Sequence, residues 1–481
     1  MTQLDFYTLL PDMLLAVWAC LLLLADLFIP REKKGLTALL AAFGLALVMG
    51  ILLAQAGREF VAFNGMLVVD GFSVFLNVLM LSTGLLGIAI AYSYLKRMGI
   101  ERGEYYSLIL FSILGMMLMA QAADLIVIFL GLELLSIPLY VLAAWARPRL
   151  DSEEAGLKYF LLGSFATGFV VYGIALTFGA TGSTRISEIL AKIASGGINT
   201  TLLLMGAALL LVGFGFKVAA VPFHMWTPDV YQGAPTPVTG FMAVGAKAAG
   251  FAALLRIFVS AFPSLGQDLT PVLWGLAALT MIVGNLVAVS QTEIKRMLAY
   301  SSIAHAGYIL MAFVPYGNPS VARDSVASAL FYLVAYAITS FGAWAVVIAL
   351  EKMEGKGLEI KDYAGLGRKY PALAAAMTVF MLSLTGVPPT LGLVGKIYLF
   401  RSVVEGGFIG LAVIGVITSL ISAYYYLRVV VVMYMQEGDP QVSADSWLSL
   451  TIGAATLATV GLSFIPADLF RLASEAVLKL F

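Results

Sequence analysis

Charged residues are scarce in this chain of 481 residues. They make up 12% of the sequence, whereas hydrophobic residues make up 61%. A soluble domain carries about 25% charged residues, so this composition is typical of a protein that crosses a membrane many times. Basic and acidic residues number 28 each. A net charge of zero gives no reason to expect a nucleic-acid partner.

Cysteine and histidine are nearly absent. The single cysteine, Cys20, lies in an apolar run, which excludes an internal disulfide and a thiolate metal cluster. His224 and His305 are the two histidines, so we expect no histidine-based metal site. A basic segment before the first apolar run is missing too, and Asp5 and Asp12 stand there instead, which argues against a cleaved signal peptide.

Long polar connections are missing as well. No connection between apolar runs exceeds about 20 residues, which leaves no room for a soluble domain that could hold a nucleotide, a flavin or an iron–sulfur cluster. We therefore expect no cofactor in this chain. Any redox chemistry coupled to it must take place on partner chains.

Apolar runs long enough to cross the hydrocarbon core dominate what remains. About 20 apolar residues are needed for one crossing. We count fourteen such spans, at about 7–29, 36–56, 71–95, 105–122, 124–146, 158–180, 202–224, 238–261, 272–290, 296–314, 326–350, 371–400, 408–435 and 447–467. The sequence therefore predicts an all-α polytopic membrane protein.

The basic residues between the spans predict its orientation. Connections after odd-numbered spans carry most of them, among them Arg31, Lys33, Lys96 and Arg97. Basic loops stay on the cytoplasmic side. With an even number of spans, both termini should face away from the cytoplasm.

Two lysines interrupt the apolar stretch 213–250. A charge near the centre of a membrane helix costs about 2.5–3.5 kcal/mol on insertion scales. We therefore expect Lys217 and Lys247 to have a polar or charged partner or a functional role. Proline removes a backbone donor and breaks helical hydrogen bonding, which hydrocarbon tolerates where protein or water supplies partners. Between the lysines lie Pro222, Pro228, Pro235 and Pro237. We expect interrupted helices around a buried, hydrated, ionisable centre.

A second stretch echoes this pattern. The seventh span contains FGFKVAAVPFH and the twelfth contains LTGVPPTLGLVGKIYLF, each with glycines, proline and one lysine, here Lys217 and Lys396. Paired interrupted segments in two halves mark the transport site of many transporters. We expect N-terminal helices in 1–104, a first repeat of spans 4–8 in 105–262, an inverted repeat of spans 9–13 in 263–436 and a last helix in 437–481.

Several other polar residues are candidates for proton transfer. Glu133 lies halfway along the fifth span and is the natural partner of Lys217, with a structural ion pair as the alternative reading. A lysine can release a proton, which arginine cannot, although lysines can also clamp helix ends. His224, seven residues after Lys217, lies on the same face if the helix continues past Pro222. We interpret the adjacent residues Tyr424, Tyr425 and Tyr426 as packing or interface aromatics.

The polar chain extends in two further places. His305, in AYSSIAHAGY, stands among Ser301, Ser302 and Tyr308 and could continue a relay across the second repeat. Lys158, in EAGLKYFLLGS, is a candidate link to the pair of Glu133 and Lys217, although anchoring of a helix end is the simpler interpretation.

Four segments carry a resemblance to a known family. LELLSIPLYVLAAW, EAGLKYFLLGSFATGFVVYGIALTFGATGST, VPFHMWTPDVYQGAPTPVTGFMA and AYSSIAHAGY resemble subunit N of bacterial respiratory complex I, the NADH–quinone oxidoreductase. More broadly, the chain is similar to antiporter-like subunits shared by complex I and multisubunit cation/proton antiporters. The resemblance covers about residues 7–467. It implies fourteen helices, two inverted five-helix repeats and broken seventh and twelfth helices.

The resemblance also implies roles for particular residues. Glu133 becomes the carboxylate that pairs with Lys217, Lys247 the central lysine, His224 a bridge and Lys396 the terminal lysine. A lysine at that last position is similar to subunits N and L, whereas subunit M has glutamate there. Subunit L carries a long C-terminal extension, which leaves subunit N. The sequence PPTLGLVGK departs from the family, which more often has alanine–glycine–phenylalanine before the glycine–lysine.

The implied function is proton translocation in the bacterial inner membrane. NADH, FMN, iron–sulfur clusters and quinone are expected on partner subunits, and the other membrane subunits of complex I are the expected neighbours. A subunit of a sodium/proton antiporter and an inert structural subunit are the alternatives. A related complex that accepts electrons from ferredoxin or a deazaflavin is a further one.

Overall fold

The computed structural model describes residues 3–262, 265–353, 355 and 357–477, and these residues are almost entirely helical. The first quarter contains α1 (Gln3–Asp26), α2 (Gly35–Gln55), the hairpin strands β1 (Phe60–Ala62) and β2 (Leu67–Val69), α3 (Gly71–Arg97) and α4 (Glu104–Gln121). The antiparallel strands pair Phe60 with Val69.

The central part of the chain contains the first interrupted span. Its helices are α5 (Leu125–Ala143), α6 (Leu150–Thr181), α7 (Ile186–Ser195), α8 (Thr200–Val218), α9 (Trp226–Gly233), α10 (Thr236–Phe241) and α11 (Lys247–Leu254). Two π-helical turns, Met242–Ala246 and Leu255–Ala261, flank α11.

The second half contains the other interrupted span. Its helices are α12 (Gly266–Ser290), α13 (Ile294–Met311), α14 (Ala322–Leu350), α15 (Leu366–Lys369), α16 (Pro371–Thr385), α17 (Leu391–Glu405), α18 (Ile409–Met435), α19 (Ser446–Gly461) and α20 (Pro466–Val477). Short 3-10 turns lie at Arg31–Lys33, Phe63–Gly65, Val314–Gly317, Ile360–Tyr363 and Leu462–Phe464.

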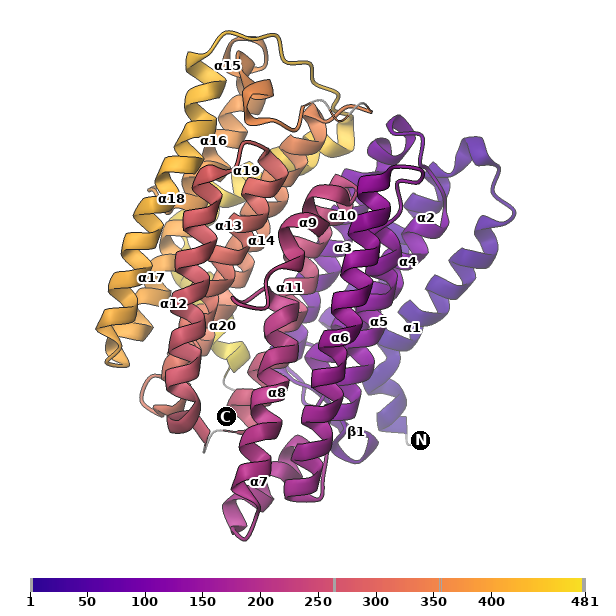
Figure 1. Cartoon of the computed structure of the whole chain (residues 1–481). Coiled ribbons are helices and arrows are strands. Elements are labelled where there is room, and N and C mark those ends of the chain that lie inside the picture. The colour runs from indigo at the N-terminus through magenta and orange to yellow at the C-terminus, as the bar shows by residue number, and fades with distance from the viewer. Residues whose placement is uncertain (1–2, 263–264, 354, 356, 478–481) are drawn as a thin grey trace.

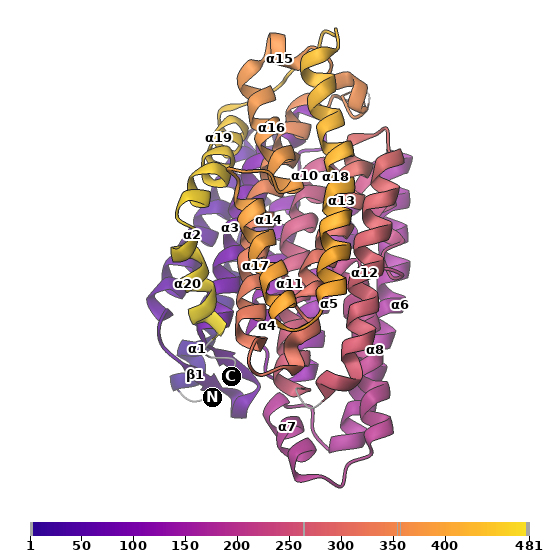
Figure 2. The same cartoon turned by 90° about the vertical axis from the view of Figure 1, so that its left-hand side faces the viewer.

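The helix lengths agree with fourteen membrane crossings. Within the described residues, thirteen helical segments are long and apolar enough to cross a membrane. The pair α16 and α17, which is broken at 386–390, supplies one more. An even number of crossings places both termini at one end of the bundle, as Figures 1 and 2 show. The prediction of an all-α polytopic membrane protein is confirmed.

The ends of the helices differ from the ends of the predicted spans at several places. The fourth and fifth spans separate at Ala122–Asp124, where the Asp124 carboxylate accepts a hydrogen bond from Ile126 N at 2.8 Å and caps α5. Helix α6 begins at Leu150, eight residues before the predicted span, because its polar first turns are helical without being apolar. The hairpin and α7 lie outside the predicted spans, and α20 overlaps the last of them only at residues 466 and 467.

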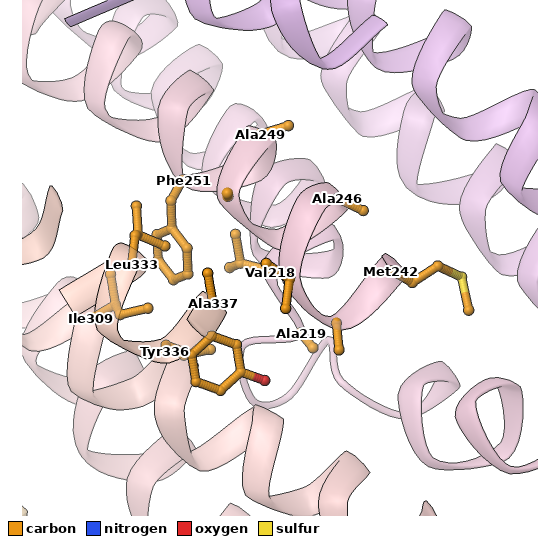
Figure 3. Packing of buried hydrophobic residues seen from close by; sticks show 14 of the residues in the cluster. Val218, Ala219, Met242, Ala246, Ala249, Phe251, Ile309, Leu333, Tyr336 and Ala337 are labelled. Atoms are coloured by element: carbon orange, nitrogen blue, oxygen red, sulfur yellow. The ribbon is translucent and has the colours of Figure 1, made fainter. Parts of the chain in front are cut away.

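The centre of the bundle is formed by α10, α11, α13 and α14. The span Thr236–Ala261 is entirely buried, and α13 and α14 are nearly so. Figure 1 shows α10 and α11 between the earlier helices on one side and the later helices on the other. In Figure 3, Ala246 and Phe251 lie in one apolar cluster with Leu333 and Ala337 of α14. This packing keeps polar groups of the centre away from lipid.

Candidate functional site

Lys217 lies just before the break in the first interrupted span. Helix α8 stops at Val218, and Ala219 follows in the left-handed conformation with φ 62°. The Lys217 side chain is 5% exposed. Its Nζ donates to Ser136 Oγ at 2.8 Å and to Tyr159 OH at 3.1 Å. The ammonium is thus held by hydroxyl groups from α5 and α6, at the carbonyl end of α8.

Glu133 lies near Lys217 but forms no direct ion pair with it. Ser136 follows Glu133 by three positions on α5, so both side chains lie on one side of the helix. The carboxylate accepts a hydrogen bond from Thr167 Oγ1 of α6 at 2.7 Å. Among the described residues no contact within 4.0 Å joins its carboxylate to the Lys217 amine, although the Glu133 charge acts on that amine, so the functional pairing of the two residues stays a prediction. Ser136 and Tyr159 take the ammonium donors instead.

Lys247 is the central buried lysine. It is the first residue of α11, directly after the π-helical turn Met242–Ala246, and is 2% exposed. Its Nζ donates to the carbonyl oxygen and to the hydroxyl of Ser302 on α13, both at 2.5 Å. One turn later on α11, a Cβ added at Gly250 would lie 3.4 Å from Cγ of Lys217. Helix α11 therefore packs directly against the first lysine.

His305 continues from Ser302 along α13. Its Nδ1 lies 2.8 Å from Tyr332 OH, and its Nε2 lies 3.1 Å from Tyr426 OH. Tyr426 also hydrogen-bonds to Ser301. The imidazole is 3% exposed. His305 is thus linked to Ser301 through Tyr426, and its part in a relay stays a prediction.

Lys396 lies at the second interruption. Helix α16 ends at Thr385 and Gly386 follows with φ 92°. Lys396 Nζ donates to the carbonyl oxygens of Leu384 at 3.0 Å and Thr385 at 2.8 Å, and to Ser419 Oγ at 2.7 Å. It also lies 4.7 Å from the centre of the Tyr308 ring. Ser302, His305 and Tyr308, spaced by three, thus lead along α13 from Lys247 to Lys396.

Two predicted residues lie apart from this series. His224 stands in the break after α8 and its buried Nδ1 has no hydrogen-bond partner among the described residues. Its alignment with Lys217 required a helix that continues past Pro222, and this condition is not met because α8 ends at Val218. Lys158 has a side chain that is 40% exposed and that pairs with Glu154 at 2.6 Å and Asp229 at 2.9 Å. This geometry agrees with the anchoring interpretation rather than with a link to Glu133.

Sequence reasoning missed most of the hydroxyl partners. Tyr332 and Tyr426 reach His305 from α14 and α18, and Tyr425 OH donates to Asn285 Oδ1 at 2.9 Å. Tyr425 and Tyr426 are buried and pack against each other, as predicted, and their hydroxyls also form hydrogen bonds that the packing interpretation did not include, whereas Tyr424 is 60% exposed. The feature of the sequence that could have indicated these hydroxyl partners is the run of three tyrosines inside an apolar span.

Other buried charges serve the helix ends. Arg256 forms a two-point contact with Asp70, which caps α3, with both N–O distances at 2.8 Å. Asp12, predicted to precede the first span, lies inside α1 and accepts a hydrogen bond from Gln121 Nε2 at 3.1 Å. Within the described ranges, histidine, cysteine and acidic side chains form no group of three that could hold a metal ion.

Comparison with known proteins identifies the family. A family model described as "NADH:quinone oxidoreductase/Mrp antiporter, TM" matches residues 122–422. NADH-quinone oxidoreductase subunit N of Chloroflexus aggregans (strain MD-66 / DSM 9485) is 48% identical over 482 residues, covering 99% of this chain and 98% of the relative. The chain belongs to the subunit N family. The Trichlorobacter lovleyi (strain ATCC BAA-1151 / DSM 17278 / SZ) member is 47% identical and covers 97% of this chain and 96% of the relative.

Solved structures agree with this assignment. A chain from "Respiratory complex I from Thermus thermophilus with bound Aureothin" matches with a TM-score of 0.82 and 38% identity over 96% of this chain and 99% of that chain. A chain from the Mrp complex of Dietzia sp. DQ12-45-1b matches with a TM-score of 0.88 and 21% identity, covering 100% and 98%. At that identity the second match shows the shared fold alone. The predicted resemblance to subunit N is confirmed.

Proposed function

We propose that this chain is the proton-translocating subunit N of an NADH–quinone oxidoreductase and that its buried amines carry the protons. One observation supports this most strongly. Lys217, Lys247, His305 and Lys396 form a series of buried titratable groups that runs from one interrupted helix to the other. The high identity to subunit N over nearly the whole chain supports the same function.

The chemistry of lysine suits this role. A lysine amine can bind and release a proton, whereas an arginine stays charged. Hydroxyl groups next to each amine can donate and accept hydrogen bonds, so they can pass a proton between titratable groups when local water enters. Glu133 accepts a hydrogen bond from Thr167, and Lys217 donates one to Ser136 on the same side of α5. In this proposal, Glu133 exchanges protons with Lys217 along that side of α5.

The energy for this movement comes from other subunits. NADH oxidation, FMN, iron–sulfur clusters and quinone reduction are assigned to partner chains, and their reaction is coupled to the lysines through conformational or electrostatic change. The other membrane subunits of the complex are its neighbours. We place the chain in the bacterial inner membrane with both termini on the non-cytoplasmic side, in agreement with the basic loops.

The two halves have a matching organisation. Each contains one interrupted span and one lysine held at the carbonyl end of the first segment of that span. This supports inverted repeats in 105–262 and 263–436, with N-terminal helices in 1–104 and a last helix in 437–481.

The site chemistry favours protons over sodium. Sodium is a hard cation that is bound by oxygen ligands, whereas the centre of this site consists of amines that are themselves cationic when protonated. Proton pumping that continues without sodium would agree with this assignment. A strict sodium requirement would favour the antiporter alternative.

The central lysine gives the sharpest test of the function. Lys247→Ala removes the amine between the two interrupted helices, so we expect NADH-driven proton translocation per electron to fall in the reconstituted complex. Lys192→Ala removes an exposed lysine of α7 and serves as the matched control. A Lys247→Ala complex that assembles and keeps the normal proton-to-electron ratio would contradict the proposal.

A further inference from the structure

Helix α9 contacts both halves of the molecule through one carboxylate. Asp229 Oδ2 accepts a hydrogen bond from Lys158 of α6 at 2.9 Å, and Asp229 Oδ1 accepts one from Arg296 of α13 at 2.7 Å. One turn later, Gln232 Oε1 accepts a second hydrogen bond from Arg296 at 2.7 Å. Gln232 also donates to Glu293. The same side of α9 is thus tied to α6 and to α13.

The first residue of α9 reaches the Lys217 pocket. The Trp226 indole stacks on the Tyr159 ring, with ring centres 4.6 Å apart and planes inclined by 7°. Trp226 Nε1 donates to the Phe216 carbonyl oxygen at 2.9 Å. The hydroxyl of that same Tyr159 accepts the hydrogen bond from Lys217 Nζ. The position of α9 therefore sets the position of one of the two groups that hold the lysine.

Helix α9 depends on its neighbours for this position. It has eight residues, and isolated helices shorter than about 12–15 residues are marginal in water. Non-helical residues 219–225 precede it, and the Ala234–Pro235 connection follows it. Tertiary contacts must hold it, and Asp229 supplies charged contacts to two different helices.

The charged surroundings of Asp229 are mixed. Lys158 also pairs with Glu154, and both flank a cavity with a volume of about 190 Å³ between α6 and α9. Partial burial raises the pKa of Glu293, against the opposing effect of Lys295. Exposed ion pairs contribute about 0–1 kcal/mol each. The contribution of Asp229 is therefore geometric rather than a large share of the stability.

We propose that Asp229 is a positioning residue for proton transfer, because it holds α6 and α13 on α9 and so keeps Trp226 and Tyr159 in place beside Lys217. The inference rests on the proposed role of Lys217. Asp229 lies outside the buried series, and it controls the geometry of Lys217 through α9.

The variant Asp229→Asn tests this role in the complete, reconstituted complex. Asparagine has similar size but removes the charge that attracts Lys158 and Arg296. We expect the rate of NADH-driven proton translocation to fall by about tenfold, since small misplacements of reacting groups have effects of that order or more. The pH profile of translocation should also shift toward lower pH, because protonated Lys217 loses the Tyr159 acceptor. Asp229→Glu should restore most of the rate.

Asp151→Asn is the matched control. Asp151 lines the same cavity on α6, so this variant removes one carboxylate there without removing the ties of α9. It should retain the rate and the pH profile of the unmodified complex. An Asp229→Asn complex that matches Asp151→Asn in both measurements would overturn the inference.

A structure of the variant complex separates positioning from a general loss of folding. We expect Asp229→Asn to show α9 displaced and the stack of Trp226 on Tyr159 broken. If the variant does not assemble, Arg296→Gln removes one of the two charged ties and should give a smaller effect in the same direction. Normal translocation per assembled Arg296→Gln complex would then count against the inference. A loss in Lys247→Ala without one in Asp229→Asn would leave the proposed function intact.

Discussion

The two interrupted helices reach the same arrangement by opposite sequence orders. Lys217 precedes its break, in the last turn of α8, whereas Lys396 follows its break, in α17. Yet the Lys396 amine reaches back to the carbonyl oxygens of Leu384 and Thr385, at the end of α16. Lys217 thus belongs to the last turn of its first segment, and the Lys396 amine lies at the last carbonyls of its first segment. A cation near the carbonyl end of a helix is stabilised by the helix dipole.

The partners of the two amines differ in kind. Lys217 is held by the side-chain hydroxyls of Ser136 and Tyr159. Lys396 is held by two backbone carbonyls and one hydroxyl, that of Ser419. Side-chain partners can move with their helices, whereas backbone partners are fixed by the break itself. The first site is thus the more adjustable one.

Removing the hydroxyl groups that hold Lys217 should lower the rate of proton translocation more than any other change at the two breaks. The double variant Ser136→Ala with Tyr159→Phe deprives Lys217 of both acceptors, and leaving a buried charged group unsatisfied costs about 3 kcal/mol. We expect proton translocation to fall roughly 10- to 100-fold. Ser419→Ala, the matched change at the second site, leaves two carbonyls and should lower the rate less than about threefold. Equal losses at both sites would show that the difference in partners has no consequence.

A methyl group at the second break should have an intermediate effect. A Cβ at Gly386 would lie 3.0 Å from Cδ of Lys396, at a φ of 92° that side chains rarely adopt. We expect Gly386→Ala to destabilise the subunit by about 1–2 kcal/mol and to slow translocation. Thermal dissociation of the complex and the pumping rate are the two measurements. An unchanged rate would mean that the Lys396 side chain tolerates displacement.

The corresponding change at the first break should have the smallest effect. Ala219 already adopts a left-handed conformation, with φ 62°. Ala219→Gly removes strain of about 1–2 kcal/mol but adds flexibility to the unfolded chain, which offsets about 0.5–1 kcal/mol. We expect nearly unchanged thermal stability and unchanged translocation. A marked loss of pumping would indicate that the methyl group of Ala219 is itself required.

Hydropathy predicted the architecture because its signals are local. The fourteen spans, the two breaks and the buried Lys217, Lys247 and Lys396 follow from apolar length, proline and isolated charge. The sequence could not predict whether Glu133 contacts the Lys217 amine directly, because this depends on how α5 is rotated against α8. Ser136, one turn farther along α5, takes the amine instead.

The remaining errors come from helix ends and from contacts between distant segments. Proline at 222 has no N–H to donate to the carbonyl four residues earlier, and the helix ends at that residue, Val218. His224 therefore leaves the face of Lys217. The contacts of Tyr332 and Tyr426 with His305 join three helices. No local pattern in the sequence specifies which faces of those helices meet.

In the proposed function, the lysine amines at the two breaks release and rebind protons. Lys217→Arg and Lys396→Arg keep a positive charge at each helix end but remove proton release, because arginine remains protonated. The proton-to-electron ratio of each assembled variant complex, measured during NADH oxidation in sealed vesicles, tests the claim directly. We expect a reduced ratio for both variants. A normal ratio in either variant would show that the charge at that break, rather than proton exchange by its lysine, is what the complex requires.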